Sequence, residues 1–150
     1  LVEMTRPSAV DAELDLTALP VLEGAEEMVA SGILSSLQPA NVRLRCALRN
    51  QAEMKDHPRY PLLFDPQTAG GLLASVPAAN ADACVAALKD LGYRETSIIG
   101  CVLPRREALE PITLLERDCV RTDWDSYTQT FVAQSRKRTR SHCTRDSEIP

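Results

Sequence analysis

Two short apolar runs on either side of an amphipathic segment constrain the possible folds of this chain more than any other feature of its sequence. Residues 71–76 (GLLASV) form a nearly continuous apolar run that predicts a buried strand. Residues 80–91 begin with an asparagine suited to cap a helix, carry an apolar face and are followed by Gly92, which suits a helix end. Residues 97–103 and 112–115 predict two further strands. This strand–helix–strand–strand order predicts an α+β domain with helices packed on a mixed β-sheet.

The N-terminal third of the chain predicts elements that can add to this sheet. Residues 1–4 look like the last turn of a helix that begins upstream. Residues 12–16 alternate apolar and polar side chains, which predicts a half-buried strand. Within residues 20–31 the apolar side chains share one stripe and the glutamates face water, so we expect an amphipathic helix. Residues 42–48 fit either a strand or a short helix capped by Asn41.

The composition is typical of a globular domain. The chain has 150 residues, 44% hydrophobic and 25% charged, and is long enough to bury a core. No apolar run approaches the ~20 residues of a membrane span, so we expect no membrane partner. The net charge of −4 argues against nucleic acid as a partner, because phosphate contacts need clustered Lys and Arg. The five cysteines lack CxxC spacing, which favours free thiols in a reducing, cytoplasmic compartment.

The C-terminal part of the chain has fewer apolar residues. We therefore expect one domain over residues 1–116 and an extension over residues 117–150. Four apolar residues of the extension are spaced four, three and four apart: Val120, Trp124, Tyr127 and Phe131. That spacing predicts one short amphipathic helix. Residues 134–150 carry a net charge of +3 against −7 for the remainder, and we expect a basic, disordered tail that is solvated or touches RNA or acidic lipids.

The sharpest local motif is the sequence DPQTAGG at residues 65–71. Pro66 disfavours helical backbone at Asp65, whose carboxylate should therefore lie on an extended or turn segment. The two glycines permit positive φ and let backbone N–H groups approach a ligand closely. The residues alone fit a tight turn that begins a strand, or a loop that borders an anionic ligand. Neither a Walker loop nor a dinucleotide-binding fingerprint is present.

The stretch 62–102, which contains the block DPQTAGGLL, resembles the C-terminal half of selenophosphate synthetases (selenide, water dikinases). The segments SSLQPANVRLR and HPRYPLLFDPQTAGG are similar to a bacterial branch of that family. The resemblance covers roughly residues 1–104. The commoner family form has Ser where this chain has Ala69, so one hydroxyl is absent while the glycines remain.

This resemblance implies a C-terminal domain like that of aminoimidazole ribonucleotide synthetase, within a two-part enzyme. The implied reaction converts ATP, hydrogen selenide and water into selenophosphate, AMP and phosphate, for selenocysteine and selenated tRNA synthesis. The family's reactive Cys or selenocysteine, its lysine and most of its magnesium-binding aspartates lie in the N-terminal half. We therefore expect no catalytic residue and no metal ligand in this chain, and no activity from it alone. The implied partners are that N-terminal half, ATP with Mg²⁺, selenide, and a second copy in a full-length homodimer.

The resemblance also implies that the loop faces a nucleotide cleft between the two halves. The implied nucleotide- or phosphate-cleft residues are Asp65, Gln67, Thr68, Gly70 and Gly71. Thr68 and the glycines would approach the phosphates, while Asp65 would orient the loop or contact metal indirectly. Two alternatives stay open: a different kinase or synthetase of the same superfamily, and a non-catalytic assembly module.

Other polar side chains support weaker hypotheses. Three cysteines lie within the predicted domain: Cys46, Cys84 and Cys101. The last two fall on apolar faces and are expected to be buried, while the first is more open. Three glutamates are expected on a solvated helix side: Glu23, Glu26 and Glu27. His57 is expected in a surface turn, and His142 with Cys143 provides too few ligands to predict a metal site.

Overall fold

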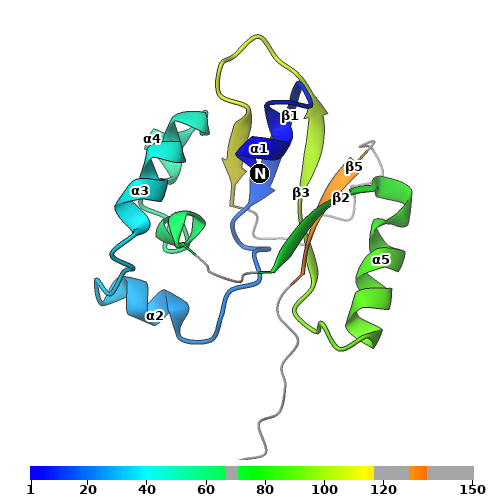
Figure 1. Ribbon diagram of the computed structural model, residues 1–150, viewed down its shortest axis with the longest axis horizontal. Helices are drawn as coiled ribbons and strands as arrows, with labels where there is room; N and C mark the ends of the chain where they lie inside the picture. The colour runs from blue at the N-terminus through cyan, green and yellow to red at the C-terminus, as the bar shows by residue number, and fades with distance from the viewer. Residues whose placement is uncertain (67–70, 117–128, 135–150) are drawn as a thin grey trace, which may run out of the picture.

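The computed structural model describes residues 1–66, 71–116 and 129–134. Its centre is a five-stranded mixed sheet in the order β2-β5-β3-β1-β4 (Figure 1). The strands are β1 (Val10–Asp15), β2 (Leu72–Pro77), β3 (Ser97–Pro104), β4 (Ile112–Leu115) and β5 (Gln129–Gln134). Strands β1 and β4 are parallel, and the other neighbouring pairs are antiparallel. The predicted α+β class, with helices packed on a mixed sheet, is confirmed.

Short helices and one long helix pack on this sheet. The α-helices are α1 (Val2–Thr5), α2 (Ala25–Ala30), α3 (Gln38–Val42), α4 (Gln51–Met54) and α5 (Ala78–Asp90). Two 3₁₀ helices complete the set: η1 (Arg43–Ala47) and η2 (Pro61–Phe64). Figure 1 shows α5 beside β2 and β5, and the short helices α2–α4 on the opposite side of the molecule. No helix of the described residues has the length and apolar character that a membrane crossing requires.

The core lies between β1, β3, β5 and the short helices. Its buried members are Ala12, Leu14, Leu16, Ala47, Leu48, Phe64, Ile99, Ile112, Leu114 and Phe131. Burying each large apolar side chain contributes about 1.5–3 kcal/mol. Every second residue from Ala12 to Leu16 belongs to this set, which confirms the period-two pattern expected for β1.

The other face of β1 is largely buried too, so the half-buried strand expected from the alternating pattern is corrected. Asp11 is 0% exposed, and its carboxylate accepts a hydrogen bond from Arg49 Nη2 at 2.7 Å. Arg105 Nη1 lies 3.4 Å from the second carboxylate oxygen of Asp11. The same Arg49 Nη2 also donates to the carbonyl of Glu110 at 2.7 Å. Burying a carboxylate without partners is costly, and these two arginines offset the desolvation of Asp11 on this face of β1.

Two predicted elements of the N-terminal third are corrected. The helix expected over residues 20–31 is only α2, because Gly24 has a φ of +83° and cannot extend a right-handed helix. Gly32 ends it with a φ of +75°, as predicted. Of residues 42–48, for which a strand and a short helix were both open, residues 42–47 are helical and Leu48 is extended with φ −94° and ψ 121°. Asn41 lies inside α3 instead of at its cap.

The region after residue 70 brings further corrections. Strand β2 exists, but it lies at the edge of the sheet with Leu72 70% exposed, so the expected burial is wrong. Helix α5 begins after Pro77 rather than after an Asn80 cap, while Gly92 follows its end with a φ of +97°, as predicted. Phe131 lies in strand β5 rather than in a helix.

The C-terminal extension is only partly described. Val120, Trp124, Tyr127 and the predicted tail after residue 134 lie outside the described residues. The boundary expected after Glu116 stays a prediction, although β5, beyond it, belongs to the same sheet as β1–β4.

Candidate functional site

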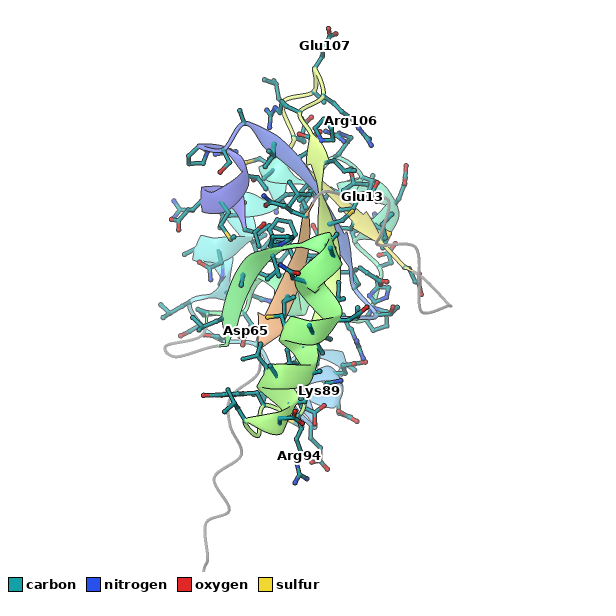
Figure 2. All side chains as sticks on the ribbon, turned by 90° about the vertical axis from the view of Figure 1, so that its right-hand side faces the viewer. Glu13, Asp65, Lys89, Arg94, Arg106 and Glu107 are labelled. Atoms are coloured by element: carbon teal, nitrogen blue, oxygen red, sulfur yellow. The ribbon has the colours of Figure 1, made fainter. Side chains whose placement is uncertain are left out.

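The described ends of the predicted ligand loop are Asp65 and Gly71. Asp65 has φ −66° and ψ 121°, so the extended backbone predicted from the following proline is confirmed. Strand β2 begins at Leu72, directly after Gly71, and Figure 2 labels Asp65 near the same end of β2. The backbone on both sides of the loop is thus part of defined structure. Three cleft residues, Gln67, Thr68 and Gly70, lie outside the described residues, and their roles stay predictions.

Two amide side chains of α3 hold the segment that leads into the loop. Gln38, only 6% exposed, donates from Nε2 to the carbonyl of Pro61 at 2.9 Å. Asn41 donates from Nδ2 to the carbonyl of Phe64 at 3.1 Å. These carbonyls are the first and last of η2, so α3 fixes that turn at both ends. Each such hydrogen bond contributes about 0.5–1.5 kcal/mol.

Aromatic packing adds to this anchor. The rings of Tyr60 and Phe64 meet edge to face with centroids 5.2 Å apart, and Phe64 is buried in the core. Burial raises the pKa of the Tyr60 hydroxyl above its ordinary range, and nearby Arg45 offsets part of that rise. Tyr60 is therefore neutral at physiological pH, where its ring serves packing rather than proton transfer.

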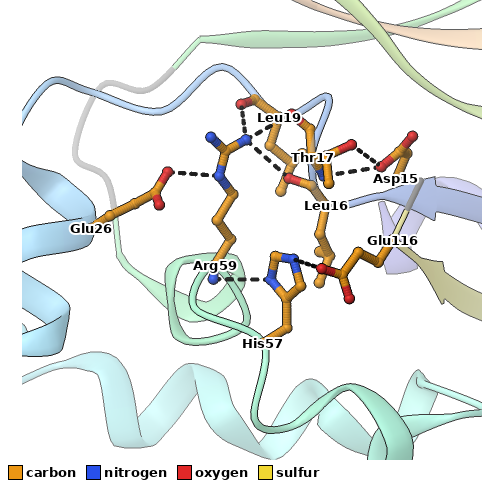
Figure 3. A network of polar contacts seen from close by, with 8 residues as sticks. All are labelled: Asp15, Leu16, Thr17, Leu19, Glu26, His57, Arg59 and Glu116. Carbon is orange, nitrogen blue, oxygen red and sulfur yellow. Dashed lines mark hydrogen bonds and ion pairs between the residues drawn. The ribbon is translucent and has the colours of Figure 1, made fainter. Parts of the chain in front are cut away.

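Arg59 forms the densest polar network beside the loop (Figure 3). Its Nε donates to Glu26 Oε1 at 2.7 Å. Its Nη1 donates to three backbone carbonyls that follow β1, those of Leu16 at 3.2 Å, Thr17 at 2.7 Å and Leu19 at 3.3 Å. One guanidinium thus joins the segment before η2 to α2 and to the chain that leaves β1. A planar fork of donors suits this task better than an ammonium group does.

His57 supports the same segment and has no catalytic geometry. Its Nδ1 accepts a hydrogen bond from the backbone N–H of Arg59 at 3.1 Å, and its Nε2 lies 3.7 Å from Glu116 Oε1. The imidazole side chain is 8% exposed, so the turn is present but the expected surface position is wrong. His57 is a packed residue whose ring nitrogens face the chain itself.

Two hollows lie on the side of the sheet occupied by α1. One, of about 350 Å³, is lined mainly by apolar side chains that include Leu1, Leu44, Leu63 and Phe64. The other, of about 450 Å³, lies between the α1 end of the chain and the strands, beside Ser75, Gln129 and Phe131. Neither of the two is lined by Asp65 or Gly71. The lining of the first suits apolar side chains better than a phosphate group, whereas polar side chains such as Thr5 and Ser8 make up part of the second lining.

The remaining candidates behave as ordinary structural residues. Cys101 is buried and Cys46 exposed, as expected, whereas Cys84 is only half-buried, so its expected burial is wrong. These three cysteines form no disulfide. Glu26 is half-buried against Arg59 rather than fully solvated. Within residues 1–66, 71–116 and 129–134, no three His, Cys, Asp or Glu residues are placed to hold a metal ion. His142 and Cys143 lie outside these ranges, so the expectation about metal ligands stays a prediction.

Sequence reasoning missed the residues that hold the loop in place. Gln38 and Asn41 each contact a carbonyl 23 positions away, and Arg59 contacts carbonyls 40 to 43 positions away. No local pattern marks such partners, because the contact exists only after the chain has folded. The single local hint was the amide-rich segment QPAN, which suggested a helix cap instead.

Comparison with known proteins identifies one group of relatives. The chain is 34% identical over 105 residues to the selenide, water dikinase of Clostridioides difficile. It is 39% identical over 110 residues to that of Trichlorobacter lovleyi, and 32% identical over 107 residues to that of Geobacter metallireducens. These matches cover 70–71% of this chain but only 30–31% of the relatives. No family model and no solved structure matches the chain.

Proposed function

Because the chain belongs to the selenide, water dikinase family and spans about 30% of its curated relatives' length, we propose that it is the C-terminal part of such an enzyme. The full enzyme would convert ATP, selenide and water into selenophosphate, AMP and phosphate, in the cytoplasm and as a homodimer. The observation that carries this proposal is the identity of 34% over 105 residues, in a chain that carries the DPQTAGGLL block.

The loop over residues 65–71 would border the phosphates of ATP. Phosphoryl transfer depends mainly on positioning and on neutralising charge, and backbone N–H groups of a glycine-rich turn can do both. The anchors described above support this role, since Asn41 and Arg59 fix the backbone before the loop and β2 fixes it afterwards. This chain would thus form one wall of the cleft, and the absent part would bring the reactive groups.

Asp65 would act through a cation rather than on phosphate directly. A carboxylate repels phosphate oxygens unless a cation lies between them. Mg²⁺ commonly binds one or two carboxylates together with substrate phosphates. Asp65 would therefore contact nucleotide-bound Mg²⁺ indirectly, through one of the waters that this ion retains, or orient the loop, and is not itself a metal ligand. The position of Asp65 at the start of the loop supports this assignment.

We predict that Mg–ATP binds this chain and that the loop glycines are required. In a titration followed by amide chemical shifts, the Gly71 and Leu72 signals should move. Gly70→Val should weaken binding about 10-fold or more, because its side chain would keep backbone amides away from the phosphates. Ala69→Ser, which adds the hydroxyl of the commoner family form, is the matched control and should bind at least as well as the parent chain. Equal affinity of the Gly70→Val variant would contradict a phosphate-binding loop.

A second candidate function is that of an assembly module without nucleotide contact. Five apolar side chains of residues 22–44, from the segment before α2 to η1, are 48–70% exposed: Leu22, Ile33, Leu34, Leu37 and Leu44. Such exposure is typical of a surface that another chain or domain covers. The same titration separates the two functions, since an assembly module gives no shift with Mg–ATP at any loop residue.

A further inference from the structure

Strand β5 joins β2 to the rest of the sheet. It lies between β2 and β3 and is antiparallel to both. The β2–β5 register runs over all six residues of β2, from Leu72 opposite Gln134 to Pro77 opposite Gln129. Among the described strands, β2 pairs with β5 and with no other. The backbone that leaves the loop at Gly71 therefore enters the sheet through pairing with β5.

Side chains of β5 are buried on both faces of the sheet. Phe131 is 1% exposed and belongs to the core that also contains Phe64, at the end of η2. Thr130 and Val132, which are 0% and 2% exposed, point to the opposite face by strand alternation, and α5 packs there. Figure 1 shows β5 beside β2, with α5 next to both. Strand β5 thus connects the two sides of the loop. Its residue Phe131 shares the core with η2, which precedes the loop, and its backbone pairs with β2, which follows the loop.

The sequence of β5 lies beyond the part that resembles the family, which ends near residue 104. We propose that residues 129–134 are positioning residues for the candidate phosphate loop, because they fix β2 in the sheet and so fix where Gly71 enters it. The C-terminal extension then contributes to the nucleotide cleft wall through β2. The effect of β5 on nucleotide affinity rests on the proposed function above, whereas its effect on the order of β2 does not.

A merely stabilising strand would give a different signature from a positioning strand. Loss of general stability raises hydrogen exchange throughout the sheet, since all strands then open together. Loss of positioning opens β2 locally and leaves the β1–β4 pair protected. The ratio of exchange rates between β2 and β4 therefore distinguishes the two roles.

The test uses the full chain with Val132→Ala and, as a matched control at the opposite edge, Ile112→Val in β4. Both residues are at most 3% exposed, and each change removes only small apolar groups. We expect Val132→Ala to raise the β2-to-β4 ratio of amide exchange rates at least fivefold, and Ile112→Val to leave it unchanged or lower it. Mg–ATP affinity should fall at least threefold in Val132→Ala and stay within twofold of the parent in the control.

An unchanged ratio in Val132→Ala would overturn the proposal, because β2 would then be ordered independently of β5. If Val132→Ala does not fold, Gln129→Ala provides the same measurement with less disruption, because this exposed side chain lies 2.5 Å from Ser75 Oγ of β2. If the parent chain binds no Mg–ATP, the proposed function fails, yet the exchange ratio still decides whether β5 positions β2.

Discussion

Replacing Gly100 with valine is expected to lower the free energy of unfolding by more than about 4 kcal/mol. Gly100 lies opposite Leu14 where β3 pairs with β1. A Cβ atom at Gly100 would collide with the carbonyl oxygen of Glu13 and would lie 3.2 Å from the Cα of Leu14. Both obstacles are backbone, so relief requires β1 and β3 to separate, and a loss this large is exceptional among single substitutions and diagnostic of such a clash. Urea unfolding followed by circular dichroism measures the effect.

The matched control for this variant is Gly24→Ala. Gly24 has open space around its missing side chain but a φ of +83°, so only backbone strain of about 1–2 kcal/mol is expected. The pair of variants therefore separates close backbone approach from left-handed geometry. A Gly100→Val protein within about 1 kcal/mol of the parent would mean that β1 and β3 do not meet as described.

The elements predicted correctly are those whose sequence pattern lies within a short stretch of neighbouring residues. The alternation in β1, the apolar run in β3 and the amphipathic pattern of α5 each depend on neighbouring residues. Strand β2 was recognised for the same reason. The exposure of β2 could not be predicted, because an apolar run such as GLLASV fits a strand at the centre of a sheet as well as one at its edge. The order of the strands in the sheet decides between these two positions. Apolar sequence predicts a strand, while its neighbours in the sheet determine burial.

Phe131 shows how spacing alone can mislead. A spacing of four, three and four apolar residues fits one face of a helix, yet Phe131 is a buried strand residue paired across the sheet with Ser75 and Gly100. Both partners are 31 or more positions away in the sequence, so no short window contains the information. Long-range pairing overrides local preference when a strand fills a central position.

The candidate site likewise has one part that the sequence predicts and another that depends on long-range contacts. The backbone of Asp65 could be predicted, because Pro66 restricts its neighbour by direct steric contact. The residues that hold this backbone in place could not, because Asn41 and Arg59 act across the fold. The sequence motif therefore locates the loop, and only the tertiary structure explains what fixes it.

Replacing Arg59 with alanine is expected to cost about 3 kcal/mol and to loosen the segment that leads into the loop. The guanidinium donates to three carbonyls after β1, and hydrogen bonds to charged groups contribute about 1.5–3 kcal/mol each without being additive. Its pair with Glu26 adds little, because that carboxylate is 40% exposed and surface ion pairs contribute about 0–1 kcal/mol. In a chain of this size the melting temperature should fall by about 6–12 °C.

Three further variants identify which contact of Arg59 carries the effect. Glu26→Gln should cost less than about 1 kcal/mol, because it removes only the solvent-screened pair. Arg59→Lys should recover less than half of the loss, since an ammonium group cannot reach all three carbonyls from one position. Arg43→Ala removes an exposed arginine whose Nε donates to the carbonyl of Ala40 at 3.0 Å, and should cost below about 0.5 kcal/mol. If Glu26→Gln proved as costly as Arg59→Ala, the ion pair rather than the carbonyls would hold this segment, and the loop anchor would have to be assigned to α2.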